Sequence, residues 1–119
     1  MKFTKEHEWL KADGEIITVG ITEYASTELG DVVYVELPEV GRAVSRGDDI
    51  VVIESVKAAS DIVAPVEGEI VEVNEEVADN PAIVNEDPMG AAWIFKIKVA
   101  DPTVIDEYLD EDAYNTLIE

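Results

Sequence analysis

One short segment holds the residues with the clearest chemical potential, Glu54-Ser55-Val56-Lys57-Ala58-Ala59-Ser60-Asp61. Its lysine has small or apolar neighbours and lies between two runs rich in β-branched residues, 50–53 and 62–64. This spacing predicts an exposed hairpin tip, where a modifying enzyme can reach the amine with little steric cover. A cofactor on this long side chain would form an arm that can swing between active sites. The spacing alone leaves open an ordinary solvated lysine.

No set of residues typical of an enzyme accompanies this lysine. His7 is the only histidine and cysteine is absent, so a nucleophilic triad or a sulfur-based metal site has little to build on. Residues 85–90 superficially resemble a calcium loop, but Met89 stands where an oxygen ligand is needed, so we interpret them as a turn. We therefore expect His7 to be structural and the chain to have no catalytic or metal site.

The composition limits the partners and the size of the fold. The chain of 119 residues suits one domain over residues 1–119, and 28 acidic against 8 basic residues give a net charge of −20. Such a charge repels nucleic acid and anionic membranes. It is either a solubility coat or an adaptation to a salt-rich cytoplasm. No apolar run approaches the ~18 residues of a membrane span, so we expect a soluble monomer.

The first half of the chain predicts short strands around one helix. Asp13-Gly14 predicts a tight type I′ turn between strands at 8–12 and 16–21. Residues 22–29, closed by Gly30, predict a short helix, and Pro38 ends a strand at 32–37. Residues 50–53 have the composition of a strand buried on both faces.

The second half adds strands and a helical tail. Strands are predicted at 62–64, 70–73 and 93–99, with one helical turn within 74–80. Asp101 and Pro102 predict a helix start, with Ile105, Tyr108 and Leu109 on one face, and a second short helix ends at Leu117 and Ile118. This arrangement predicts a mainly β sandwich or barrel with short peripheral helices and a C-terminal helical tail.

The Lys57 segment is one of a series of motifs that span the chain. In order, they are Lys5-Glu6-His7-Glu8-Trp9, Thr18-Val19-Gly20-Ile21-Thr22, Leu29-Gly30-Asp31-Val32-Val33, Val35-Glu36-Leu37-Pro38-Glu39-Val40-Gly41, residues 52–61, and Pro65-Val66-Glu67-Gly68-Glu69. Asn80-Pro81, residues 84–88 and Trp93 complete the series. In this series the chain resembles the glycine cleavage H-protein family along essentially its whole length. Glu6 departs from it where other members can have a smaller polar residue.

That resemblance implies a fold and a function. The fold would be a lipoyl-domain-like barrel-sandwich hybrid of two antiparallel sheets. Lys57 would carry lipoate as an amide, attached by a lipoate ligase or a lipoyl transferase. The protein would be a non-catalytic carrier that moves the aminomethyl group of glycine from the glycine decarboxylase (P protein) to the aminomethyltransferase (T protein). Dihydrolipoyl dehydrogenase (L protein) would reoxidise the arm.

The resemblance also implies a surface cleft that would bind the loaded arm. In the family the arm folds into a surface cleft, and the positions that match its polar contacts are Glu8 and Asp61. The alternative is that neither residue has a special role among the 28 acidic residues of the chain. A bacterial or archaeal cytoplasm is the expected location, and a mature mitochondrial form would have the same appearance.

Three other functions would place different residues around the lysine. A biotin carrier usually has methionines beside its lysine, whereas Val56 and Ala58 stand here. A lipoyl domain of a 2-oxoacid dehydrogenase usually has aspartate before the lysine and is shorter. A structural or inhibitory acidic protein would explain the charge but not the acylation motif.

Overall fold

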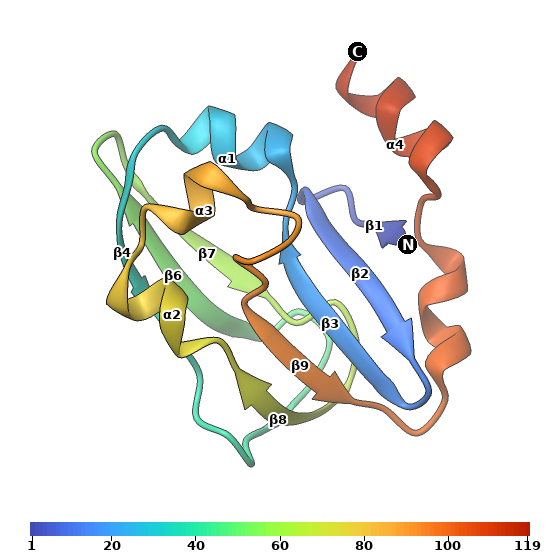
Figure 1. Ribbon diagram of the computed structural model, residues 1–119. Coiled ribbons are helices and arrows are strands. Elements are labelled where there is room, and N and C mark those ends of the chain that lie inside the picture. Colours follow the sequence, from blue (N-terminus) through green and yellow to red (C-terminus); the bar gives the residue numbers. More distant parts are fainter.

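The computed structural model describes all 119 residues and contains two antiparallel sheets (Figure 1). The larger sheet has the strand order β1-β2-β3-β9-β8-β5, and the smaller sheet has the order β4-β6-β7. The strands of the larger sheet are β1 Lys2–Phe3, β2 Glu8–Asp13, β3 Ile16–Ile21, β9 Phe95–Lys98, β8 Gly68–Val73 and β5 Ala43–Val44. Those of the smaller sheet are β4 Val32–Glu36, β6 Asp49–Ser55 and β7 Ala59–Val63.

The hairpin of β2 and β3 is confirmed, but its predicted turn type is wrong. Asp13 pairs with Ile16, so the two loop residues are Gly14 and Glu15. Only Gly14 of these two has a positive φ, at 62°. A type I′ turn needs positive φ at both central residues, so this loop cannot be one.

Five helical segments at the ends and edges of the sheets complete the fold. The α-helices are α1 Glu23–Leu29, α2 Glu75–Asp79, α3 Ile83–Glu86 and α4 Glu111–Ile118, and a 3₁₀ helix η1 spans Pro102–Glu107. The Thr22 hydroxyl caps α1 by accepting from the Ala25 N–H, and Gly30 ends it with φ 74°. None of the helices has the length and apolar character that crossing a bilayer requires.

Two predictions for the irregular segments are corrected. Of residues 85–90, interpreted as a turn, 85 and 86 instead end α3, whose Ile83 and Val84 are buried against the core, whereas residues 88–90 do form a turn. In the tail, Asp101 caps η1 as predicted, but the helix ends before Tyr108. Leu109 instead forms a β-bridge with Phe3, so it does not share a helical face with Ile105.

A hydrophobic core joins the two sheets and covers their inner faces. It is a cluster of 23 buried residues, dominated by valine and isoleucine from both sheets and completed by α2, α3 and η1. A second, smaller cluster of Phe3, Trp9 and Tyr114 attaches α4 to the edge of the larger sheet. The predicted fold class, two antiparallel sheets with short helices and a C-terminal helix, is confirmed.

Candidate functional site

Lys57 lies at the exposed tip of the β6–β7 hairpin. Glu54 pairs with Ala59, so residues 55–58 make the turn. The Ser55 N–H donates to the Ala58 carbonyl at 2.8 Å, and the Ser55 hydroxyl accepts from the backbone N–H groups of Lys57 and Ala58, each at 3.2 Å. These bonds fix the backbone of the tip while the Lys57 side chain remains exposed.

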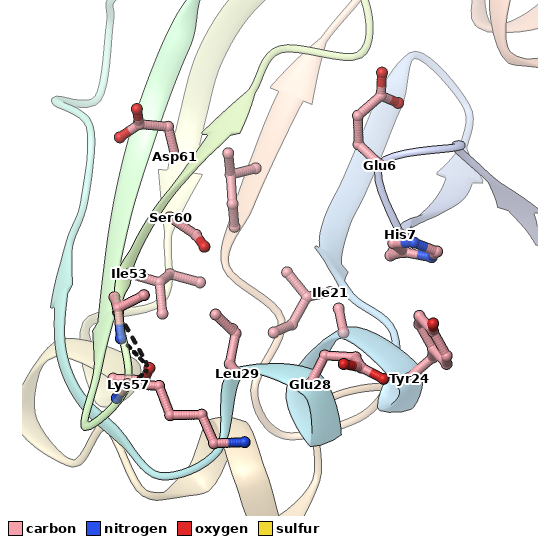
Figure 2. A pocket seen from close by; sticks show the side chains of 14 residues that line it. Glu6, His7, Ile21, Tyr24, Glu28, Leu29, Ile53, Lys57, Ser60 and Asp61 are labelled. Atoms are coloured by element: carbon pink, nitrogen blue, oxygen red, sulfur yellow. Dashed lines mark hydrogen bonds between the residues drawn. The ribbon is translucent and has the colours of Figure 1, made fainter. Parts of the chain in front are cut away.

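An open groove of about 480 Å³ runs from Lys57 across the end of the smaller sheet. Its walls come from the β6–β7 hairpin, from α1 and from the loop before β2, and Figure 2 shows Lys57 pointing from the tip toward α1. The apolar part of the lining is Ile21, Ala25, Leu29, Ile53, Ala58 and Ile62. The remaining lining residues are Glu6, His7, Tyr24, Glu28, Ser55, Lys57, Ser60 and Asp61.

Gly30 lies against the aliphatic stem of the Lys57 side chain. A Cβ atom placed on Gly30 would lie 3.2 Å from Lys57 Cε and 3.6 Å from Cδ. The backbone of Gly30 also has φ 74° and ψ −157°, a conformation that residues with a side chain rarely adopt. The backbone conformation therefore favours glycine here, and the stem of Lys57 packs closely over it.

The structure brings Asp61 to the groove but leaves Glu8 beneath the surface. Asp61 is an exposed residue of β7 that lines the groove, on the same hairpin as Lys57. Glu8 is 2% exposed, accepts a hydrogen bond from the Thr4 hydroxyl at 3.2 Å, and is not among the lining residues. The two residues predicted as contacts of the arm therefore do not share one surface.

Burial dominates the chemistry of Glu8. Desolvation raises the pKa of this carboxyl to about 8, the hydrogen bond from Thr4 opposes the rise, and nearby Glu6 adds to it. The second oxygen, Oε2, is buried and has no hydrogen-bond partner. A buried acceptor without a partner is a place where a donor from a bound group would be favoured.

Three residues of the groove were not predicted as part of the site from the sequence: His7, Tyr24 and Glu28. Tyr24 and Glu28 are four residues apart on α1, and this spacing could have placed them on one helical face. His7 carries a positive φ of 69°, its ring lies 4.7 Å from that of Tyr24, and its Nδ1 is 2.8 Å from the Tyr114 hydroxyl. A contact 107 residues away in sequence left no local signal for His7.

The groove suits a long amphipathic arm with a cationic end. Apolar side chains make up much of its lining, and three acidic residues, Glu6, Glu28 and Asp61, are among the lining residues. Apolar walls stabilise the methylene chain and ring of an acyl group, while carboxylates attract an ammonium group at its tip. The residues present therefore fit a lipoyl group on Lys57.

Comparisons with known proteins agree with this geometry. The family model described as Glycine cleavage H-protein matches residues 1–119. The chain is 58% identical to the glycine cleavage system H protein of Escherichia coli, with 100% of this chain and 93% of that protein covered. It is 50% identical to the H protein of Parvibaculum lavamentivorans, with 100% and 95% covered.

A solved structure shows the same fold. The crystal structure of a glycine cleavage system H protein from Mycobacterium marinum superposes with a TM-score of 0.87 at 40% identity, covering 97% of this chain and 93% of that one. The full-length match to the family model, the identity to these relatives and the shared fold lead to one conclusion. The chain belongs to the glycine cleavage H-protein family.

Proposed function

We propose that this protein is a non-catalytic carrier of the glycine cleavage system and that Lys57 is its lipoate acceptor. The observation that carries the proposal is the position of Lys57, at a rigid exposed tip and at the mouth of an apolar, acid-lined groove. The chain has six lysines, of which Lys57 is the one that lines the groove. A lipoate ligase or a lipoyl transferase attaches the group there.

Lys57 would hold the lipoyl group, which would supply a disulfide that is reduced as it takes up the aminomethyl group from glycine decarboxylation and that would pass this group to the aminomethyltransferase. Dihydrolipoyl dehydrogenase reoxidises the arm. The body of the protein holds the arm on one hairpin, so that each enzyme receives the reacting atoms at the end of a tether. Tethered delivery replaces free diffusion of a labile group, and this is the contribution of a carrier that performs no reaction alone.

Intact mass after incubation with a lipoate ligase tests the acceptor. Wild type is expected to gain one lipoyl mass, and Lys57→Ala is expected to gain none while keeping its fold, because an exposed tip lysine contributes little to packing. Lys11→Ala, at an exposed lysine of β2, is the matched control and should gain the same mass as wild type. A lipoyl mass on Lys57→Ala would assign the acceptor to another lysine. A biotinyl mass would point to a different carrier class.

The groove is also proposed to shelter the loaded arm. Asp61 lines the groove, and a protonated amine beside a carboxylate in a partly dry site gains ~1–3 kcal/mol, against ~0–1 kcal/mol for a fully exposed pair. Glu8 is buried, so it can contact the cargo only if the amine of the cargo reaches the buried Oε2 atom. Of the two, Asp61 is expected to have the larger effect.

The release of the cargo tests this shelter. Wild type, Asp61→Asn and Glu8→Gln are loaded with the aminomethyl group, and its spontaneous loss as formaldehyde and ammonia is timed. Asp61→Asn is expected to release the cargo up to roughly 5-fold faster, because Asp61 is exposed and an exposed ion pair contributes ~1 kcal/mol at most. Glu69→Gln, at an exposed carboxylate of β8 outside the groove, is the control. Equal rates from all four proteins would exclude both carboxylates as the clamp.

A further inference from the structure

The tip that carries Lys57 is held by the segment Gly30-Asp31-Val32, in which Gly30 and Asp31 connect α1 to β4 and Val32 begins β4; we call this segment the Gly30–Val32 connection. The Val56 N–H donates to the Asp31 carbonyl at 3.0 Å, and Val32 pairs with Ser55 in the smaller sheet. The stem of Lys57 lies against Gly30. The position of the tip and the direction of the lysine therefore both depend on where this connection is held.

Asn85, from α3, holds the connection on both sides of Asp31. Its Nδ2 donates to the Gly30 carbonyl at 2.7 Å, and its Oδ1 accepts from the Val32 N–H at 2.9 Å. A carboxylate would lack the donor and an apolar side chain would lack both groups, so a primary amide is what these two partners require. The orientation of the amide is fixed as well, because a carbonyl faces its nitrogen and an N–H faces its oxygen.

The helix that presents Asn85 is itself anchored. Ile83 and Val84 are buried in the core, and the Ser26 hydroxyl of α1 donates to the Val84 carbonyl at 2.9 Å. Asn85 is half-buried and does not line the groove. Any influence it has on the lysine must therefore pass through the connection.

We propose that Asn85 is a positioning residue for Lys57, acting through the Gly30–Val32 connection; this inference rests on the proposed function of Lys57 as the lipoate acceptor. Asn85 fixes the peptide groups on both sides of Asp31, and this orients the Asp31 carbonyl toward the Val56 N–H. The same hydrogen bonds keep Gly30 in contact with the stem of Lys57. A modifying enzyme then meets the amine in one orientation. Freeing the connection lets the tip sample other orientations, of which few suit the enzyme.

The chain offers a matched control for this residue. Asn74 also uses its amide for backbone hydrogen bonds, donating to the carbonyls of Ala91 and Trp93 at 2.8 and 2.7 Å and accepting from the Glu76 N–H at 3.2 Å. It lies at the start of α2 and does not line the groove. Asn74→Ala therefore removes a similar set of hydrogen bonds without touching the connection.

The experiment compares Asn85→Ala and Asn74→Ala in two measurements. The first is kcat/KM for lipoylation by a lipoate ligase, and the second is amide hydrogen exchange at Val56 relative to the core strands. Both variants are expected to lower the melting temperature. Only Asn85→Ala is expected to reduce kcat/KM, by roughly 10- to 100-fold, and to accelerate exchange at Val56. If Asn85→Ala fails to fold, Asn85→Asp keeps the acceptor facing Val32 and carries the same test.

Two results would overturn the inference. One is an Asn85→Ala protein that is lipoylated and exchanges at Val56 as wild type does. The other is an equal loss in Asn85→Ala and Asn74→Ala, which would reduce the role of Asn85 to general stability. If the proposed function itself were wrong, the intact mass would show it, because wild type would gain no lipoyl mass. The exchange at Val56 would still report whether Asn85 holds the tip.

Discussion

Glu8 is the residue at which burial and charge oppose each other most strongly. It is the one carboxylate among the buried side chains, and a single hydroxyl, that of Thr4, donates to its side chain. The neutral form avoids the cost of burying a charge. The protein therefore keeps a group whose ionisation near pH 8 works against the folded state.

The pH dependence of stability follows from the sign of this shift. The folded pKa of about 8 lies above the ordinary value of 4.5, so ionisation favours the unfolded chain. The contribution of Glu8 to stability is complete below pH 4.5 and is lost progressively as the pH rises to about 8. Glu8→Gln, which cannot ionise, should gain roughly 2–4 kcal/mol relative to wild type between about pH 5 and about pH 9.

Urea unfolding of both proteins at several pH values measures this difference. Comparison with Glu54→Gln, an exposed carboxylate of β6, separates the burial of Glu8 from the general loss of one negative charge. If wild type, Glu8→Gln and Glu54→Gln gave parallel stability curves, Glu8 would not titrate with a raised pKa.

The site shows what residue patterns can and cannot reveal. The tip position of Lys57 could be predicted from its segment, because strand-like runs on either side of small residues are a local feature, but its role as an acceptor was implied only by the family resemblance. Asp61 was implied by the resemblance, and it lines the same groove as Lys57. The burial of Glu8 could not be predicted, because it depends on how β2 packs against Thr4 and the tail. Asn85 was missed because its partners lie more than 50 residues away.

At the scale of elements, the C-terminal segment helps to build the far end of the groove. Phe3 and Leu109 exchange two backbone hydrogen bonds of 2.8 and 2.9 Å, and the ring of Tyr114 stacks on Phe3 with centroids 4.7 Å apart. The Tyr114 hydroxyl then meets both the Thr22 hydroxyl at 2.6 Å and His7 Nδ1 at 2.8 Å. Helix α4 thus holds His7 in its unusual backbone conformation beside α1.

Removing only the hydroxyl of Tyr114 tests this link. Tyr114→Phe keeps the ring on Phe3 and is expected to lower the free energy of unfolding by about 0.5–3 kcal/mol, because both bonds are buried or partly buried. The NMR signals of the His7 ring should shift at the same time. Tyr34→Phe is the control, at an exposed tyrosine of β4, and should change neither measurement. A Tyr114→Phe protein as stable as wild type, with unmoved His7 signals, would contradict the link.

The elements that could be predicted are those whose signals are local. The β2–β3 hairpin, α1 with its Thr22 cap and Gly30 end, and the start of η1 each follow from adjacent residues. Strands β1 and β5 have two residues each and exist only because β2 and β8 pair with them. The end of η1 follows the same rule, since pairing of Leu109 with Phe3 draws the chain out of the helix.

At the scale of the whole molecule, the charge of −20 is barely compensated by contacts within the chain. Two ion pairs are present, Arg46–Glu107 and Lys96–Glu72, and both involve exposed carboxylates. Exposed pairs of this kind contribute little to stability. Repulsion among the many surface carboxylates is therefore the dominant electrostatic term, and it destabilises the compact state.

Added salt should accordingly stabilise the fold. The Debye length falls from ~10 Å at 0.1 M salt to ~3 Å at 1 M, which screens repulsion between carboxylates along the surface. The same screening weakens the two ion pairs, but they are too few to offset the gain. Thermal melts in sodium chloride at both concentrations should show a midpoint several degrees higher at 1 M, since ~1 kcal/mol shifts the midpoint of a domain this size by roughly 4 °C. An unchanged or lower midpoint at 1 M would mean that the charge acts as a solubility coat only.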